Sequence, residues 1–287
     1  MRANNDDSLT TLKPELYVAS NQIQWGVNLK ALENFQKSFG RDEKGEQQYL
    51  DLGCGTGDFT REGLLPRCLP CRRIVAVDVS RDMVEYARSH FGHPKITYDV
   101  LDVVADDVSD FVERHGQFDS VFSFFCLNWV RNQEKALKNI ALLMKPGGNC
   151  LLLFCASTPL MRCHQELAQM KRWEKYAHIC HNFIPPSQDL EGSDVLESYM
   201  KDLLKMANLT PSRCKVVHGT GDYANLESLV RAHVAMSPMT TLVTDEEMPL
   251  FLEDVKEQAR KLWAVKEAGG SPFEIDVFVV FASSKAS

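Results

Sequence analysis

The residues that most clearly could do chemistry are three acids that lie at or near the ends of apolar runs. Asp51 lies in the run 49–52, Asp78 ends the run 73–78, and Asp102 follows the run 96–101. If these runs are parallel strands, their carboxyl ends meet at one edge of a sheet, where α/β proteins bind ligands. The acid after the second strand usually binds the hydroxyls of a ribose, and Asp102 could accept from an adenine amino group. The spacing therefore predicts a nucleoside-binding edge.

Three glycines at alternate positions, Gly53, Gly55 and Gly57, follow the first acid. Glycine adopts positive φ without strain and lets a ligand approach the main chain closely. A dinucleotide fold places its third glycine one residue later, where the loop seats a pyrophosphate. Here the carboxylate of Asp51 beside the loop would repel phosphate and attract a cation, such as an ammonium or a sulfonium. The alternative interpretation is a tight turn beside exposed acids.

Together, the glycine loop and the three acids resemble the class I S-adenosylmethionine-dependent methyltransferases. The resemblance implies S-adenosyl-L-methionine as the cofactor and no metal. The residues that we expect to bind it lie in the glycine loop and at the ends of the first four strands: Asp51, Gly53, Cys54, Gly55, Asp78, Val79, Met83, Asp102, Val103 and Phe124.

The fold class expected for such a chain is α/β, a Rossmann-like seven-stranded sheet, mostly parallel with the last strand antiparallel, with helical insertions that form a lid. We expect one domain over 1–287, with covering helices at 14–39, a cofactor-binding core at 49–154, and helical insertions at 155–212 and 222–271. A packing layer beneath the sheet is the alternative to a lid. Within this frame, Gly26 is expected to divide the first helix in two, and Asp58 to cap the helix after the glycine loop.

The need for a general base limits which chemical groups could accept the methyl group. Amine, phenol and hydroxyl acceptors usually require one, and the loop after the fourth strand lacks the Asn/Asp-Pro-Pro-aromatic motif that resembles amino-methyltransferases. A carboxylic acid is ionised at pH 7 and needs no base. Neutral donors would suffice to aim it, and the amide of Gln24 and the indole N–H of Trp129 can both donate.

A narrower resemblance is carried by Ser20–Gln24, Phe122–Trp129, Leu151–Phe154 with Thr158–Pro159, and Phe183–Pro186. These segments look like the arthropod juvenile hormone acid methyltransferases, which convert a sesquiterpenoid acid such as farnesoic or juvenile hormone acid to its methyl ester. The resemblance implies that Gln24 and Trp129 are the catalytic residues over the acceptor carboxylate. The family usually has histidine where this chain has Asn128, which leaves the particular acid open.

We expect the substrate to contact an aromatic and polar set drawn from several segments: Tyr17, Phe125, Asn128, Trp173, His233 and Met236. The methionine- and aromatic-rich later segments suit a long hydrocarbon tail. Trp129 as a core residue and Gln24 as an ordinary helix residue are the alternatives.

Composition excludes several other classes of protein. A net charge of −7 argues against nucleic acid or an anionic membrane surface as the main partner. Nine scattered cysteines indicate reduced thiols, and the N-terminal segment lacks the apolar run of a signal peptide, so we expect a cytoplasmic protein. Cys68 and Cys71 have the spacing of zinc ligands, but a structural site usually needs a second close pair.

Two other functions remain open at this stage. The same cofactor chemistry could act on an unrelated small metabolite or amine, or the chain could be a binding module that holds the cofactor without catalysis. Product analysis with a panel of acids and amines separates the first from carboxyl methylation. A nicotinamide-dependent dehydrogenase is disfavoured by the glycine spacing.

Overall fold

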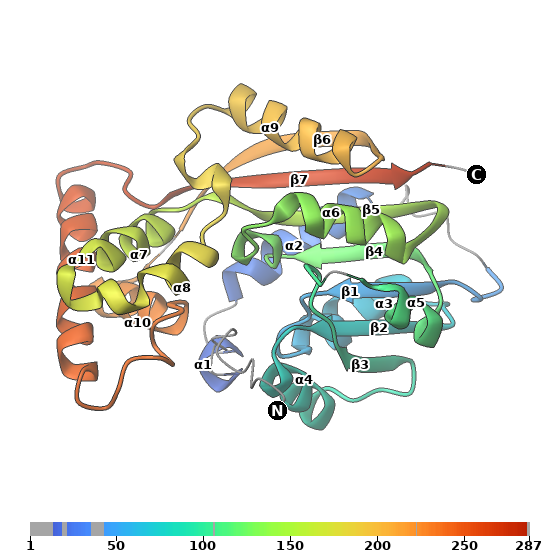
Figure 1. The fold of residues 1–287 in the computed structure, drawn as a ribbon, viewed down its shortest axis with the longest axis horizontal. Helices are drawn as coiled ribbons and strands as arrows, with labels where there is room; N and C mark the ends of the chain where they lie inside the picture. Colours follow the sequence, from blue (N-terminus) through green and yellow to red (C-terminus); the bar gives the residue numbers. More distant parts are fainter. Residues whose placement is uncertain (1–13, 19–21, 36–42, 106, 222, 286–287) are drawn as a thin grey trace, which may run out of the picture.

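The computed structural model describes residues 14–18, 22–35, 43–105, 107–221 and 223–285, which form one mixed sheet covered by helices (Figure 1). The strand order is β3-β2-β1-β4-β5-β7-β6. Strands β1 to β5 pair in parallel, whereas β7 is antiparallel to both β5 and β6. The predicted fold class is therefore confirmed. The strands are β1 (Gln48–Leu52), β2 (Arg73–Asp78), β3 (Ile96–Val100), β4 (Phe118–Phe124), β5 (Met144–Ser157), β6 (Leu209–Thr220) and β7 (Glu274–Ser284).

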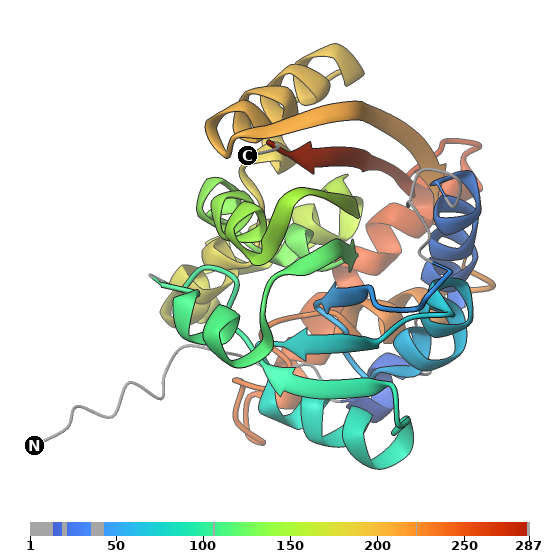
Figure 2. The same ribbon diagram turned by 90° about the vertical axis from the view of Figure 1, so that its right-hand side faces the viewer.

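Helices cover both faces of this sheet (Figure 2). On one face, α2 (Gln22–Phe35), α3 (Leu65–Cys68) and α4 (Arg81–His90) contribute to the same apolar cluster as β1 and β2. On the other face, a second apolar cluster is formed with α5 (Ser109–His115), α6 (Gln133–Leu143) and α9 (Ser193–Met206). The strands between them are apolar on both sides, as buried parallel strands are.

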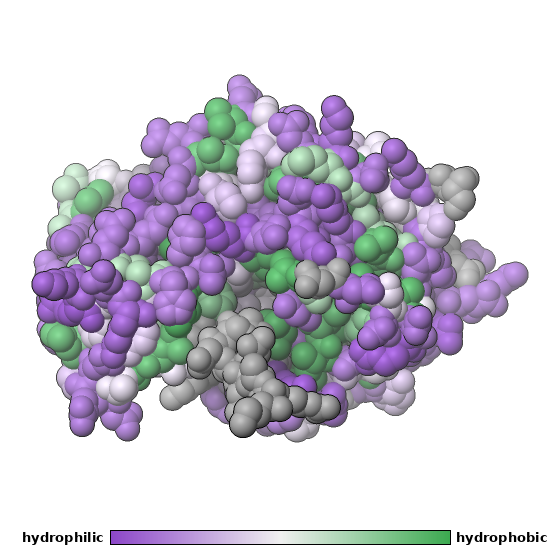
Figure 3. All heavy atoms as spheres, viewed as in Figure 1, coloured by the Kyte–Doolittle hydropathy of each residue, from purple (hydrophilic) through white to green (hydrophobic). Residues whose placement is uncertain are grey.

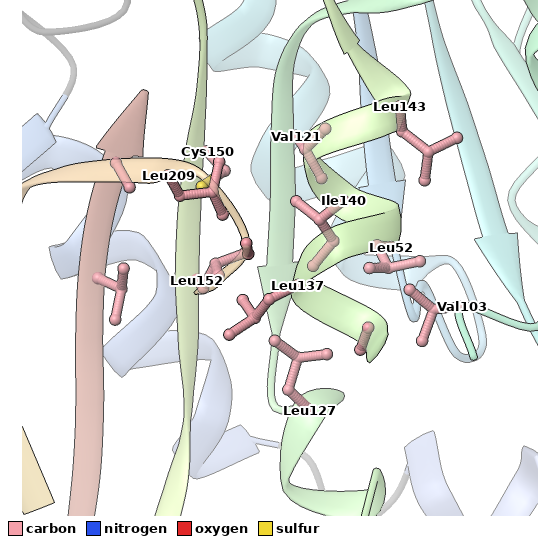
Figure 4. Packing of buried hydrophobic residues seen from close by; sticks show 14 of the residues in the cluster. Leu52, Val103, Val121, Leu127, Leu137, Ile140, Leu143, Cys150, Leu152 and Leu209 are labelled. Carbon is pink, nitrogen blue, oxygen red and sulfur yellow. The ribbon is translucent and has the colours of Figure 1, made fainter. Parts of the chain in front are cut away.

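The packing on the second face is dense around α6. Leu137 and Ile140 of this helix lie against Val121 and Leu152 of the central strands, and Leu52 at the end of β1 belongs to the same cluster (Figure 4). All five side chains are at most 1 % exposed. This close packing fixes the carboxyl end of β1, where the glycine loop begins.

A separate helical layer extends beyond the carboxyl ends of the parallel strands (Figure 1). Its apolar side chains form a cluster of their own around Trp173 and Phe251, which is joined by Leu167 and Met239. In Figure 3 the face of the molecule is mostly hydrophilic, with hydrophobic side chains gathered towards its middle. The layer consists of α7 (Pro159–Gln169), α8 (Ala177–Asn182), α10 (Leu226–Ala235) and α11 (Met248–Glu267); its predicted role as a lid stays a prediction.

Some local expectations were wrong. Gly26 does not break the N-terminal segment; it lies inside α2, and the separate helix α1 (Pro14–Val18) precedes it. Nothing lies within 4 Å of the position of a Cβ on Gly26, so a glycine on this open helix face is tolerated at only a modest cost. Asp58 is itself helical, and its carboxylate accepts from the side chains of Thr56 and Trp25. A π-helical turn, Thr60–Leu64, follows it.

The side chains of Ser80 and Asn132 cap the N-termini of α4 and α6. Ser80 accepts from the N–H of Met83 at the start of α4, as serine commonly does at this position. Asn132 accepts from the N–H of Lys135 at the start of α6. None of the helices in the described ranges is long and apolar enough to cross a membrane.

We predict that the helical layer is anchored by a buried bond between Trp173 and Asp254. The Trp173 indole Nε1 donates to Asp254 Oδ2 at 2.8 Å, and Trp173 is 1 % exposed. Trp173→Phe leaves a largely buried carboxylate without this donor and should lower the free energy of unfolding by about 1–3 kcal/mol in urea titrations.

Trp263→Phe is the matched control, because its indole donates to Glu267 at the surface of α11. It should change the free energy of unfolding by less than about 0.5 kcal/mol. Equal effects of the two substitutions would contradict the anchoring role.

Candidate functional site

The main-chain N–H groups of the glycine loop are used within the protein. Gly53 N and Cys54 N donate to Val77 O at the end of β2, at 2.8 and 2.9 Å, and Gly57 N donates to Cys54 O at 3.0 Å. Gly55 N donates to Asp78 Oδ2 at 3.0 Å. A pyrophosphate-binding loop needs such groups free to face its ligand. At these four residues the loop therefore lacks the free donors of an anion site, in agreement with its glycine spacing.

Two of the loop glycines are required by packing. A Cβ on Gly53 would lie 2.3 Å from Cβ of Cys126 in the loop after β4, and one on Gly57 would lie 2.7 Å from Cβ of Ala87 in α4. Both residues also have φ of +78°. The glycines thus bring the carboxyl ends of β1 and β4 together, and only Gly55 is left with an open side, where the ring of Tyr17 approaches.

Asp51 is a buried carboxylate at the carboxyl end of β1. It is 3 % exposed, and its Oδ2 accepts from the hydroxyl of Thr60 at 2.6 Å. Burial raises the pKa of Asp51 to about 7, with smaller upward contributions from Asp78 and Asp58, although the bond from Thr60 opposes the shift. A cation beside Asp51 would stabilise its ionised form.

The other two acids also lie at this edge of the sheet. Asp78 Oδ1 accepts from Ser80 N at 2.9 Å, and burial raises the pKa of Asp78 in spite of its main-chain bonds. Asp102 Oδ1 accepts from Val104 N at 2.9 Å. Each carboxylate keeps further lone pairs that can accept from ribose or adenine. These nucleoside roles stay predictions.

A small cavity lies between the glycine loop and the N-terminal helices. Its volume is about 30 Å³. The Tyr17 hydroxyl donates to Gln24 Oε1 at 2.9 Å at this place. The lining residues are Tyr17, Gln24, Trp25, Asn28, Asp51, Gly53, Cys54, Asp58, Phe59 and Phe124.

Three aromatic rings pack edge to face along one side of this cavity. The Trp25 and Phe59 centroids are 5.2 Å apart at 90°, and those of Phe59 and Phe124 are 5.1 Å apart at 72°. The Trp25 indole donates to Asp58 Oδ2 at 2.9 Å, which fixes the ring. Aromatic faces attract cations. The aromatic rings and the carboxylates therefore both favour a positively charged ligand.

The loop after β4 holds Asn128 and Trp129 in a strained turn. Phe125 has φ of +52°, a conformation that bulky side chains rarely adopt and that clusters at functional sites. With the Asn128 amide oriented to satisfy its neighbours, its nitrogen donates to Phe125 O at 3.1 Å. Its oxygen then accepts from the Trp129 indole at 3.0 Å. The predicted donor of Trp129 is thus engaged by its neighbour.

Several predicted site residues lie elsewhere in this structure. Trp173 is buried against α11. His233 is 2 % exposed, its Nδ1 has no hydrogen-bond partner within the described ranges, and its ring centroid lies 6.4 Å from that of His164. Burial lowers the pKa of His233 to about 4. Met236 follows α10. Val103 packs in the apolar cluster that the sheet forms with α5, α6 and α9. None of these four lines the cavity, so their roles stay predictions. Met83 is buried in the first turn of α4, after Val79.

Sequence reasoning missed four lining residues as ligand contacts: Trp25, Asn28, Asp58 and Phe59. Asn28 stands four residues after Gln24, so both lie on the same face of one helix. That spacing could have identified it once Gln24 was proposed. Phe59 could not be found, because its direction depends on the helical turn after the loop.

The thiol of Cys54 lies within the glycine loop. Cys54 is buried, and burial raises its pKa well above the usual range, which agrees with a packing role. Cys68 and Cys71 are both buried. Among the described residues, no group of three or more His, Cys, Asp or Glu side chains could hold a metal ion.

The residues at this edge fit the cofactor expected from the sequence. Asp51 is a buried acceptor, and the buried Oδ1 of Asn28 has no hydrogen-bond partner among the described residues, which suits a cationic methionine moiety. Asp78 and Asp102 follow adjacent parallel strands, as the nucleoside portion requires. A phosphate-bearing cofactor would find carboxylates here, beside loop glycines whose N–H groups are already engaged.

Comparison with known proteins gives a consistent result. Residues 50–152 match the family described as "Methyltransferase domain". The chain is 30 % identical over 250 residues to the juvenile hormone acid O-methyltransferase of Bombyx mori, which covers 86 % of each protein. It is 37 % identical over 174 residues to that of Drosophila melanogaster, covering 60 % of this chain and 58 % of the relative.

Solved structures show the same fold at low identity. The phosphoethanolamine N-methyltransferase 2 of Haemonchus contortus, in complex with S-adenosyl-L-methionine, has a TM-score of 0.53 at 18 % identity. The match covers 96 % of this chain and 57 % of that one. A proposed methyltransferase of Bacillus halodurans C-125 has a TM-score of 0.55 at 18 % identity, covering 89 % of this chain and 99 % of that one.

Asp51→Asn is predicted to change how stability depends on pH. An unfolded aspartate ionises near pH 4, whereas burial raises the pKa of folded Asp51 to about 7. Between these values the folded chain binds a proton that the unfolded chain has lost, so stability falls as the pH rises from 4 to 7.

The amide introduced by Asp51→Asn cannot titrate, so the variant should gain stability relative to the natural chain over this window, by up to about 4 kcal/mol. Above pH 7 the difference should stay constant. Urea titrations of the ligand-free proteins at several pH values measure it, and parallel stability curves would show that Asp51 titrates normally.

Proposed function

Because the chain belongs to the juvenile hormone acid O-methyltransferase family, we propose that it transfers a methyl group from S-adenosyl-L-methionine to the carboxylate of an apolar acid. The acceptor class that we propose is a sesquiterpenoid or fatty-type acid, such as farnesoic or juvenile hormone acid, and the product is its methyl ester. The similarity to the Bombyx mori enzyme over 86 % of both chains supports this reaction. The observation that carries the proposal is the position of Gln24. It is a neutral hydrogen-bond donor and lines the cavity beside the glycine loop.

The cofactor supplies an electrophilic methyl group on a positively charged sulfur. This chain provides buried acceptors for its cationic portion, Asp51 foremost, and a hydrogen-bonded acid, Asp78, for the ribose. The aromatic rings of Trp25 and Phe59 exclude water from the same place. Positioning the acceptor and excluding water supply most of the acceleration in a reaction of this type.

Gln24 is proposed to aim the acceptor carboxylate. Its carbonyl oxygen accepts from the Tyr17 hydroxyl, which leaves the amide N–H groups as the end that can donate. A carboxylate needs no proton removed before it attacks the methyl group, because its pKa lies near 4–5. A neutral amide donor is therefore sufficient, and Tyr17 orients it.

Trp129 is proposed to donate a second hydrogen bond to the acceptor. In the ligand-free structure its indole N–H donates to Asn128 Oδ1. The acceptor carboxylate, being charged, is the stronger partner and can take over this bond. Asn128 keeps its own bond to Phe125 O.

Gln24→Glu tests the charge of the acceptor. The substitution keeps the shape of the side chain but replaces the donating amide by a carboxylate, which repels an anionic acceptor. Methyl transfer to farnesoic acid, followed with labelled cofactor, should fall at least 100-fold, or about 3 kcal/mol.

Gln24→Met is the matched control, because it loses the donor without adding charge, and it should be less impaired than Gln24→Glu. An amine acceptor would instead tolerate the glutamate. Undiminished transfer by Gln24→Glu, or transfer to amines alone in a panel of acids and amines, would contradict carboxyl methylation.

Trp129→Phe should slow transfer to the acid about 10-fold or more, because it removes one donor to a charged group. The affinity for S-adenosylhomocysteine, measured by calorimetry, should stay within about twofold. Trp263→Phe, which alters an indole far along α11, serves as the control for both measurements. An unchanged rate in Trp129→Phe would remove the indole from the mechanism.

A further inference from the structure

Asn28 is a buried amide with an unused acceptor. Its side chain is 5 % exposed and lines the cavity beside the glycine loop, yet its Oδ1 has no hydrogen-bond partner among the described residues. Leaving a buried polar atom unpaired costs about 1–3 kcal/mol, and such atoms are rare in folded proteins. An unpaired acceptor in a cavity that a ligand enters indicates that the ligand supplies the donor.

The position of Asn28 on α2 follows from the helix period. Gln24 and Asn28 are four residues apart, and the same face continues with Ala31, Leu32 and Phe35, which are buried in the core. The apolar part of this face fixes the helix against the sheet. Its first two side chains are therefore held rigidly over the cavity as a pair of amides.

The surroundings of Asn28 determine what kind of donor fits. Asp51 shares the cavity with one oxygen bonded to Thr60, and both oxygens of Asp58 accept from side chains, those of Thr56 and Trp25. The loop N–H groups of Gly53 and Cys54 are bonded to Val77 O. Acceptors and carboxylates thus dominate the free polar surface, which favours a cation with several N–H donors.

We propose that Asn28 is a cofactor-binding residue that accepts a hydrogen bond through Oδ1 from the α-ammonium group of the cofactor's methionine portion, together with Asp51. This inference deepens the proposed function and rests on it only through the cofactor. It says nothing of the acceptor acid. Asn28 gives the cavity selectivity for ligands that carry an amino-acid tail.

Paired titrations with two ligands test this role without catalysis. S-Adenosylhomocysteine carries the ammonium group, whereas 5′-methylthioadenosine shares the nucleoside and sulfur but lacks the amino acid. Isothermal calorimetry of Asn28→Ala should show affinity for S-adenosylhomocysteine about 10- to 100-fold weaker, as expected for a lost bond to a charged group. Affinity for 5′-methylthioadenosine should change less than about twofold, which also shows that the nucleoside site is folded.

Asn28→Asp separates an acceptor from a donor. It keeps an oxygen at this position, so affinity for S-adenosylhomocysteine should stay within about threefold of the natural chain or improve. If the amide instead donated to the carboxylate of the ligand, Asn28→Asp would bind as weakly as Asn28→Ala, and the proposal would be overturned.

Asn34→Ala is the matched control, because Asn34 is an exposed asparagine on the same helix; it should leave both affinities unchanged. Equal weakening of both ligands by Asn28→Ala would indicate a purely structural role and overturn the proposal, as would no change for either. Should Asn28→Ala fail to fold, Asn28→Ser replaces it in the same titrations. Because no acid is present, failure of the chain to methylate any acid leaves this result intact.

Discussion

The site depends on the hydrogen bonds that tie the glycine loop to the end of β2. Val77 O accepts from two successive loop N–H groups, and the Asp78 carboxylate accepts from a third. These bonds engage the N–H groups of the loop within the protein, where a phosphate cannot use them, and carboxylates remain among the polar groups beside the loop. The same short stretch of chain that could have seated an anion is thereby converted into a site for a cation. Asp51 is buried at this site, and none of the described residues that line the cavity with it is positively charged.

The parts of the fold that the sequence predicts are those set by local period and by single residues. The apolar runs 49–52, 73–78 and 96–101 predict the first three strands, and the acid at or near the end of each run predicts the binding edge. Ser80 predicts the start of α4 because its hydroxyl caps the first turn. The glycine pattern predicts the charge of the ligand, although Gly53 and Gly57 are needed for contact with Cys126 and Ala87 rather than for contact with a ligand.

The parts that the sequence does not predict are those set by tertiary contacts. Gly26 is tolerated inside α2 because the rest of that helix is packed on the sheet, and a propensity argument cannot weigh this packing. Trp173 was expected at the substrate, but the pairing of its indole with Asp254 arises only once α11 folds against it. The engagement of Trp129 by Asn128 likewise depends on the unusual turn at Phe125. Interactions of this kind join residues whose separation in sequence carries no pattern.

Burial raises the pKa of Asp51 to about 7, and a positively charged ligand beside this acid would favour its ionised form. Calorimetry of S-adenosylhomocysteine binding at pH 6.5, repeated in buffers with different ionisation enthalpies, measures the protons exchanged. Because burial raises the pKa of Asp51 to about 7 and an ammonium beside it would lower that pKa again, binding should release protons at this pH. The neutral ligand 5′-methylthioadenosine should release fewer. Proton uptake on binding S-adenosylhomocysteine, or equal exchange by the two ligands, would contradict the account.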